Sequence, residues 1–178
     1  MHGVIFNQLA QFVKGSYGQD SLTSILGRAD LNAKTYMLTT SYPDEELEAI
    51  ITGACHELSM ERDVVLDAFG QFIAPNLMKI YGSYVKNEWT AFDLLENIES
   101  TIHETVRSNN PGAEPPMLDI KRVSNEELTI TYRSKRKMLT FGEGIIKAIG
   151  KHYNEQLVMK KSLHTDFELL TVTCQNVN

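Results

Sequence analysis

Residues 128–136 read LTITYRSKR, and this stretch decides the class of fold. β-Branched and aromatic side chains alternate along Leu128–Arg136, which is typical of a half-buried strand. A second strand-like run, Met117–Val123, precedes it across the short turn Ser124-Asn125-Glu126. Strands joined by so short a turn pair in antiparallel fashion, so the sequence predicts an antiparallel sheet here.

The pattern after this hairpin becomes helical and then returns to strands. From Met138 to Tyr153 the apolar residues follow helical spacing. We expect Gly142 and Gly144, which fall inside this helix, to serve close packing rather than a phosphate-binding loop. Gln156–Ser162 and Phe167–Cys174 again have the pattern of two strands joined by a short turn.

Upstream of residue 107 the apolar spacing is helical. Four helices are expected. The first two are Val4–Val13 and Leu47–Leu58, and Pro43 begins the second. Ser59 is expected to cap the third helix, which carries Val64, Phe72 and Ile73 in its core stripe and is ended or kinked by Pro75. The fourth is a long helix that Thr90 caps and that runs to about Val106. A helical part followed by a β-rich part predicts an α+β fold, with N-terminal helices packed on a C-terminal antiparallel sheet and its helices.

Charge divides the chain at a proline-rich segment. Ser41–Glu104 holds 13 acidic and 3 basic residues, whereas Lys121–Lys161 holds 10 basic and 4 acidic residues. Between them, Arg107–Pro116 carries three of the five prolines, and proline resists helix formation. We therefore expect a helical subdomain, 1–106, and a sheet-containing subdomain, 117–178.

Length and composition set further limits. Residues 1–178 suit one domain, since domains run to roughly 100–200 residues. No apolar stretch reaches the ~18 residues of a membrane span, and the N-terminus lacks the basic region of a signal peptide. Cys55 and Cys174 are too few for a disulfide framework. With a net charge of -6, we expect a cytoplasmic domain that binds neither nucleic acid nor membrane.

The strand 128–136 ends in unusual chemistry. Alternate side chains of a strand share a face, which places three hydrogen-bond donors, Tyr132, Ser134 and Arg136, at the end of an apolar surface. A phenol, a hydroxyl and a guanidinium together suit a carboxylate or phosphate that has an apolar body. The alternative is an ordinary strand end that emerges into water. Arg133 and Lys135 fall on the opposite face, which we expect to be solvated.

None of the five histidines has the spacing of a zinc finger or a metal-binding helix. His103 lies near the end of the helix expected at 90–106, on a face with Phe92, Glu96 and Glu99, where a capping or exposed histidine is the ordinary interpretation. No Walker loop, GxGxxG, HExxH or GxSxG motif is present, so a binding protein is favoured over an enzyme.

These features together resemble the haem-nitric oxide/oxygen binding (H-NOX) family over essentially the whole chain. The resemblance is carried by the Tyr-x-Ser-x-Arg motif at 132–136, the MHGVIFN start, Tyr42-Pro43-Asp44, Ala68-Phe69-Gly70, the loop Pro111–Pro116, and His103 about thirty residues before the strand motif. The histidine, the proline pair and the strand motif in this order are its specific part.

The resemblance implies a role for each candidate residue. The implied cofactor is haem b (iron protoporphyrin IX), with His103 as the iron ligand, bound as neutral imidazole while its second nitrogen faces another group. Tyr132, Ser134 and Arg136 are then expected to hold the haem propionates, and Pro116 to press on the haem and distort it. The expected pocket walls are Ile5, Leu9, Ile73, Phe141 and Ile145.

The residue at position 141 bears on which gas is bound. By resemblance, family members that hold oxygen stably carry a tyrosine where this chain has Phe141. A donor to bound oxygen contributes roughly 1.5–3 kcal/mol, which is on the order of 10–150-fold in affinity at about 1.4 kcal/mol per decade. An apolar wall therefore favours a sensor of nitric oxide that excludes oxygen, with carbon monoxide as a second ligand.

The resemblance also implies a separate signalling partner, a histidine kinase or a diguanylate cyclase, and the acidic part 41–104 is one candidate for the contact. Cys174 stands alone in its region, so no cysteine-bound zinc is expected. Two alternatives stay open. One is a carrier for a non-haem amphipathic carboxylate, such as a fatty acid, which leaves His103 without a role. The other is an oxygen-handling or redox haem protein of the same fold.

Overall fold

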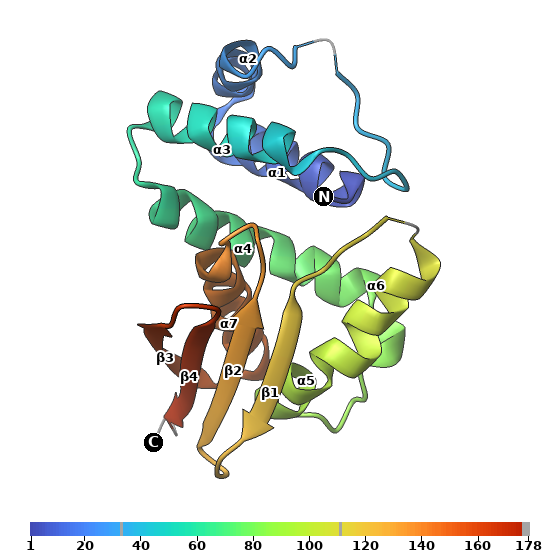
Figure 1. Ribbon diagram of the computed structural model, residues 1–178, viewed down its shortest axis with the longest axis vertical. Helices are drawn as coiled ribbons and strands as arrows, with labels where there is room; N and C mark the ends of the chain where they lie inside the picture. Colours follow the sequence, from blue (N-terminus) through green and yellow to red (C-terminus); the bar gives the residue numbers. More distant parts are fainter. Residues whose placement is uncertain (33, 111, 176–178) are drawn as a thin grey trace.

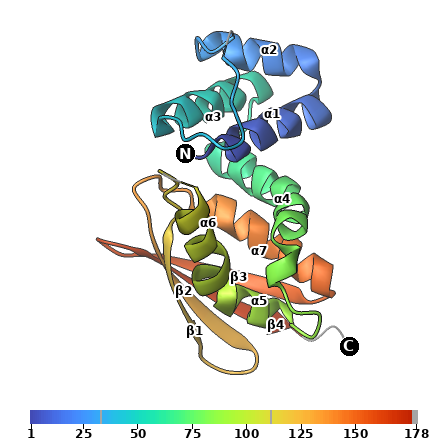
Figure 2. The ribbon, with the colours of Figure 1, turned by 90° about the vertical axis from the view of Figure 1, so that its right-hand side faces the viewer.

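The computed structural model describes residues 1–32, 34–110 and 112–175. In it the later helices pack on one face of a four-stranded sheet, and the first three helices lie beyond one end of that sheet (Figures 1 and 2). The helices are α1 (Gly3–Tyr17), α2 (Gln19–Arg28), α3 (Asp44–Leu58), α4 (Arg62–Ile80), η1 (Gly82–Tyr84), α5 (Ala91–Asn97), η2 (Ile98–His103), α6 (Glu104–Asn109) and α7 (Leu139–Tyr153). The strands are β1 (Met117–Arg122), β2 (Glu127–Arg133), β3 (Gln156–Leu163) and β4 (Glu168–Gln175). Within the described ranges, none of the helices combines the length and hydropathy that crossing a bilayer requires.

The sheet is organised around β2. Its strand order is β1-β2-β4-β3, and each neighbouring pair is antiparallel. Leu128, Ile130 and Tyr132 alternate along β2 as its buried face. The predicted α+β class, both strand pairs and the helix between them are confirmed, although β2 ends at Arg133 rather than at Arg136.

The buried side chains form two apolar cores that meet where α4 lies beside α7 (Figure 2). Residues of α1 to α4 build the first core. Residues of α5, α7 and the sheet build the second. α5 therefore packs with the sheet although it precedes the proline-rich segment. The boundary between the two cores thus differs from the boundary between the acidic and basic parts of the chain, which lies at 107–116.

Two glycines let α4 and α7 approach closely. A Cβ on Gly70 would lie 2.2 Å from the carbonyl oxygen of Phe141, and a Cβ on Gly144 would lie 2.2 Å from that of Asp67. The predicted close packing is thus confirmed for Gly144. It is wrong for Gly142, around which a Cβ would find open space to 4 Å.

Ser59 does not cap a helix as predicted, and Pro75 does not end one. Ser59 ends α3 in the left-handed conformation, with φ of 53°, and this conformation is incompatible with an N-cap, which needs extended backbone. α4 begins at Arg62 and continues through Pro75 to Ile80. The φ of proline is helical and Ala74 beside it is fully buried, so tertiary packing outweighs the hydrogen bond that proline removes.

Exposure also differs from the helical pattern in α4, and α2 was not predicted. Val64 and Phe72, expected in the core, are exposed by 52% and 39%. The pattern gave no expectation for α2, because only Leu22 and Ile25 of that helix are buried and two residues are too few for a period.

The long helix expected at 90–106 is divided into α5, η2 and α6. Thr90 caps α5 as predicted, through a capping box with Asp93. η2 is a π-helical turn, and α6 then continues the helix to Asn109. π-Helical turns are rare and often occur at functional sites, and apolar spacing does not reveal them.

Gly144→Ala should destabilise the protein. Its methyl group would clash with the Asp67 carbonyl across the contact of α4 with α7, and overpacking of this kind costs about 1–3 kcal/mol. Gly15→Ala is the matched control, since Gly15 lies in α1 with open space around it, and helix propensity should raise its stability by up to about 1 kcal/mol. Urea denaturation measures both free energies of unfolding. Equal values for the two variants would show that the contact tolerates a side chain.

Candidate functional site

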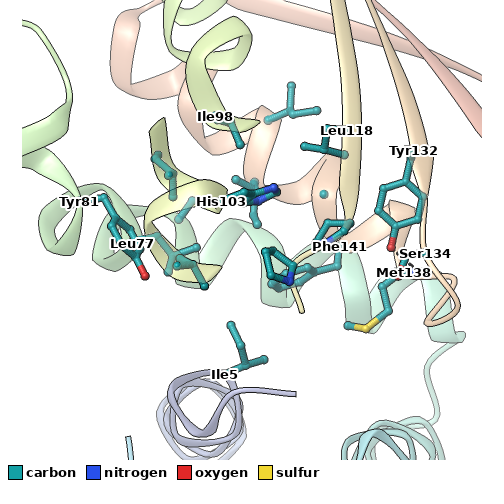
Figure 3. A pocket seen from close by; sticks show the side chains of 18 of the residues that line it. Ile5, Leu77, Tyr81, Ile98, His103, Leu118, Tyr132, Ser134, Met138 and Phe141 are labelled. Carbon is teal, nitrogen blue, oxygen red and sulfur yellow. Dashed lines mark hydrogen bonds between the residues drawn. The ribbon is translucent and has the colours of Figure 1, made fainter. Parts of the chain in front are cut away.

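A cavity of about 270 Å³ opens next to the contact of α4 with α7. α1, α4 and α7 form one side of it, and the segment from α5 to α6 with β1 and β2 forms the other. Figure 3 shows His103, Phe141 and Tyr132 around this space, with Ile5 of α1 facing them. The wall is largely apolar; its polar side chains are His2, Tyr81, His103, Asn110, Glu114, Tyr132, Ser134 and Arg136. An apolar cavity with few polar groups is the usual form of a cofactor site.

His103 ends the π-helical turn η2 and lines the cavity. Its Nδ1 lies 2.9 Å from Oε2 of Glu99. An ionised carboxylate can only accept a hydrogen bond, so Nδ1 carries the proton and Nε2 keeps its lone pair. Burial lowers the pKa of His103, against the opposing effects of Glu99 and of the backbone of Pro116, so the neutral ring predominates at pH 7. A neutral imidazole with one available nitrogen is the form that binds a metal ion.

Glu99 is itself held by two further donors. Its Oε1 accepts from Nη2 of Arg107 at 2.6 Å, and its Oε2 accepts from the backbone N–H of Leu118 at 3.2 Å. Burial tends to raise the pKa of Glu99, but the hydrogen bonds from Arg107 and His103 outweigh burial and hold that pKa below its ordinary value. Glu99 is therefore ionised, and it joins η2 to β1. Helical spacing put Glu99 and His103 on one face without revealing their contact.

Tyr132, Ser134 and Arg136 meet at the cavity as predicted, but by a different route. The strand ends at Arg133, so a turn, and not the alternation of a strand, brings Ser134 and Arg136 to the wall. The backbone N–H of Met138 donates to Oη of Tyr132 at 3.2 Å, and that of Arg136 donates to Oγ of Ser134 at 3.2 Å. Because both hydroxyl oxygens accept these bonds, their own protons can be donated to an anion.

The guanidinium of Arg136 is mostly buried, with 14% of the side chain exposed. Its Nη1 donates to the backbone carbonyl of Glu114 at 2.5 Å. Its Nε lies 2.8 Å from Oδ2 of Asp44, which pairs the guanidinium with a carboxylate of the chain. The guanidinium also lines the cavity, where its charge favours an anion.

Asp44 connects this end of the cavity to the N-terminus. Its Oδ1 accepts from the amino group of Met1 at 2.6 Å, while Oδ2 faces Arg136. Burial tends to raise the pKa of Asp44, but these two cations outweigh it and hold the pKa below its ordinary value. The first turn of α3 is thereby tied to the turn that follows β2.

The structure places the expected wall residues in two groups. Ile5, Pro116, Phe141 and Ile145 line the cavity. Leu9 and Ile73 instead lie fully buried in the first core. Helical spacing predicts that a residue faces inward, but it does not separate a packed core from the cavity beside it. The lining also includes residues that spacing did not single out: Ala74, Leu77, Met78, Tyr81, Val85 and Leu118.

The described side chains include no complete set of metal ligands. Across residues 1–32, 34–110 and 112–175, no group of three or more His, Cys, Asp or Glu side chains could hold a metal ion.

Comparison with known proteins decides the family. A family model described as haem-NO-binding matches residues 2–161, which is nearly the whole chain. The chain belongs to the haem-NO-binding (H-NOX) family. It is also similar to soluble guanylate cyclase gcy-31 of Caenorhabditis elegans, with 23% identity over 172 residues. That match covers 95% of this H-NOX chain but 24% of the relative, so the chain spans about a quarter of that protein.

Solved H-NOX structures have the same fold. The H-NOX protein from S. oneidensis, crystallised in the Fe(II)NO ligation state, has a TM-score of 0.91 at 23% identity, with 99% of this chain and 100% of that chain covered. The Fe(II) unliganded H-NOX protein from K. algicida has a TM-score of 0.90 at 19% identity, with 100% and 99% covered. The resemblance to H-NOX proteins stated from the sequence is thus confirmed, together with its α+β fold.

The residues around the cavity fit the haem that this family of gas sensors binds. The apolar wall suits a porphyrin, and His103 offers one nitrogen to an iron. The hydroxyl groups of Tyr132 and Ser134, with the guanidinium of Arg136, suit carboxylate tails at one edge of the ring.

Loss of a donor at this edge should weaken haem retention. Arg136→Ala removes a charged donor worth roughly 1.5–3 kcal/mol, and Tyr132→Phe a neutral one worth roughly 0.5–1.5 kcal/mol. Arg133→Ala and Lys135→Ala are the matched controls, because both side chains are exposed. The rate of haem transfer to a scavenging apoprotein measures retention. Equal losses in all four variants would contradict the assignment of this edge.

Proposed function

We propose that this chain is a haem-based sensor that binds nitric oxide in preference to oxygen. The observation that carries the proposal is a cavity with a neutral, oriented His103 on one side and the apolar ring of Phe141 on the other. Haem b in this cavity would supply the iron to which a diatomic gas binds. The residues of the chain bind the haem, orient it and keep water away.

The proposed roles follow from position. His103 would hold the iron through Nε2, and Tyr132, Ser134 and Arg136 would hold the anionic edge. Pro116, which precedes β1 and lines the cavity, would press on the haem face. The other lining residues, Ile5, Phe141 and Ile145, would wall the haem, while Leu9 and Ile73 support that wall from the core behind it.

Phe141 supports selectivity against oxygen. Its ring packs on Phe69, with 5.0 Å between ring centroids, and carries no N–H or O–H donor. Bound oxygen gains negative charge on its outer atom and is stabilised by a donor, whereas nitric oxide binds ferrous haem strongly without one. Tyr81 also lines the cavity, but it lies at the opposite end from Tyr132 and its hydroxyl points away from His103 (Figure 3).

The position of the cavity between two cores supports a signalling role. α4 and α1 belong to the first core, whereas α5, which leads into η2, belongs to the second. A gas that weakens the bond to His103 would let η2 shift relative to α4, which is a two-state change biased by a ligand.

The proposal extends to the partner and the setting. We propose that the shift acts on a separate histidine kinase or diguanylate cyclase, that the chain itself catalyses no reaction, and that it works in the cytoplasm. The acidic part 41–104 is the candidate contact surface.

His103→Gly should give protein that contains little haem unless imidazole is supplied during expression. Imidazole can enter the space of the lost ring and bind iron in its place. His152→Gly is the control, because that side chain is exposed. Absorption spectra and haem content report the result. A His103→Gly protein with full haem content and the unchanged ferrous spectrum would contradict the ligand assignment.

The ferrous protein should bind nitric oxide and carbon monoxide and form no oxygen complex that lasts in air. Phe141→Tyr should raise oxygen affinity on the order of 10–150-fold if its hydroxyl reaches the gas. Tyr81→Phe, the control, should change none of these properties.

Spectra under each gas distinguish the alternatives. A wild-type oxygen complex that lasts for hours would contradict the selectivity, and its loss in Tyr81→Phe would locate the donor at Tyr81. A protein that binds a fatty acid in the cavity and takes up no haem would instead support the non-haem carrier.

A further inference from the structure

We propose that Glu99 is a positioning residue that strengthens the bond between His103 and the haem iron, and so sets how readily nitric oxide breaks that bond. This inference rests on the proposed function, because it concerns the ligand that the function assigns to the iron.

Glu99 contacts Nδ1 of His103, the ring nitrogen that is not available to bind a metal ion. The 2.9 Å contact joins Oε2 to Nδ1, and the two residues stand four apart within the π-helical turn η2. Both side chains are largely shielded from water, with 28% of Glu99 and 16% of His103 exposed. Shielding matters, because a charge-assisted hydrogen bond is stronger when water does not compete for it.

The carboxylate is fixed from three directions. Arg107 holds Oε1 at 2.6 Å from α6, and the backbone N–H of Leu118 holds Oε2 at 3.2 Å from β1. With His103 as the third donor, the carboxylate cannot turn away without losing several bonds. Glu99 therefore fixes both the orientation of the imidazole and the nitrogen that carries its proton.

A carboxylate on the second nitrogen of a metal-bound histidine increases the basicity of the first. Nε2 of His103 then donates more electron density to iron and binds it more tightly. The iron–His103 bond, which nitric oxide must weaken, is thus stronger with Glu99 in place than it would be without this carboxylate. Arg107 donates a hydrogen bond to the other oxygen of Glu99, which reduces the negative charge available to His103 and so limits the increase in basicity.

The same contacts give movement of His103 a route to the sheet. Oε2 of Glu99 accepts from both His103 and Leu118, and Leu118 pairs with Tyr132 in the register of β1 with β2. Displacement of the imidazole therefore changes a contact at the edge of the sheet, beside the strand that carries Tyr132.

The test uses haem-loaded, ferrous protein in four forms: wild type, Glu99→Gln, Glu99→Ala and the control Glu104→Gln. Glu99→Gln keeps the shape and an oxygen acceptor but removes the charge. Glu104→Gln removes an equal charge from the residue next to His103; Glu104 is exposed, and no hydrogen bond in the described structure joins it to His103. Resonance Raman spectroscopy gives the iron–histidine stretching frequency. The absorption spectrum with stoichiometric nitric oxide gives the fraction that has lost histidine.

The stretching frequency should fall from wild type through Glu99→Gln to Glu99→Ala. The equilibrium for loss of histidine with nitric oxide should rise by roughly 10–100-fold in Glu99→Ala, the usual effect of removing such a partner. The midpoint potential should become more positive in the same order. Glu104→Gln should match the wild type in all three. If Glu99→Ala does not fold, the isosteric Glu99→Gln decides the question alone.

Two failures have different meanings. A wild-type protein without haem, or without an iron–histidine stretch, would overturn the proposed function itself. A wild type that behaves as proposed, with Glu99 variants that share the frequency and potential of Glu104→Gln, would overturn the role of Glu99 alone. The role of Glu99 is overturned in the same way if these variants lose only thermal stability, since a purely structural residue leaves frequency and potential unchanged.

Discussion

The close contact between α4 and α7 is the constraint on which the rest of the structure depends. Gly70 and Gly144 allow it, because a Cβ at either position would meet a carbonyl oxygen of the other helix at 2.2 Å. The two helices belong to different cores, so their contact fixes one core against the other. The cavity lies beside this contact, and Phe141 and Ile145 of α7 form part of its wall. The geometry of the cavity therefore follows from helix packing.

The chemistry of the cavity is divided among elements that are distant in sequence. The π-helical turn supplies His103, the turn after β2 supplies Ser134 and Arg136, and α7 supplies the apolar ring of Phe141. Each group could thus contact a different part of one bound cofactor: its iron, its carboxylate edge and the site where a gas binds. Glu99 links the first of these to β1, so the histidine is held by the sheet as well as by its own helix.

Much of the fold follows from residue pattern, and the site follows only in part. The α+β class and both strand pairs could be predicted, because turns and alternation are local features. The cap at Thr90 could be predicted for the same reason. Regular helical steps placed Phe92 and Glu96 beside His103, whereas Phe92 is buried in the second core and Glu96 pairs with Arg122. A π-helical turn changes the direction of side chains without changing composition, so regular steps grouped Glu99 correctly with His103 but misplaced Phe92 and Glu96.

The central claim is that the cavity holds a haem whose iron is bound by Nε2 of His103. A crystal structure of the ferrous, haem-loaded protein without gas tests this most directly. The predicted result is iron bonded to Nε2, Nδ1 in contact with Glu99, and the carboxylate tails beside Tyr132, Ser134 and Arg136. Iron bound by another residue, or haem held outside this cavity, would contradict the claim.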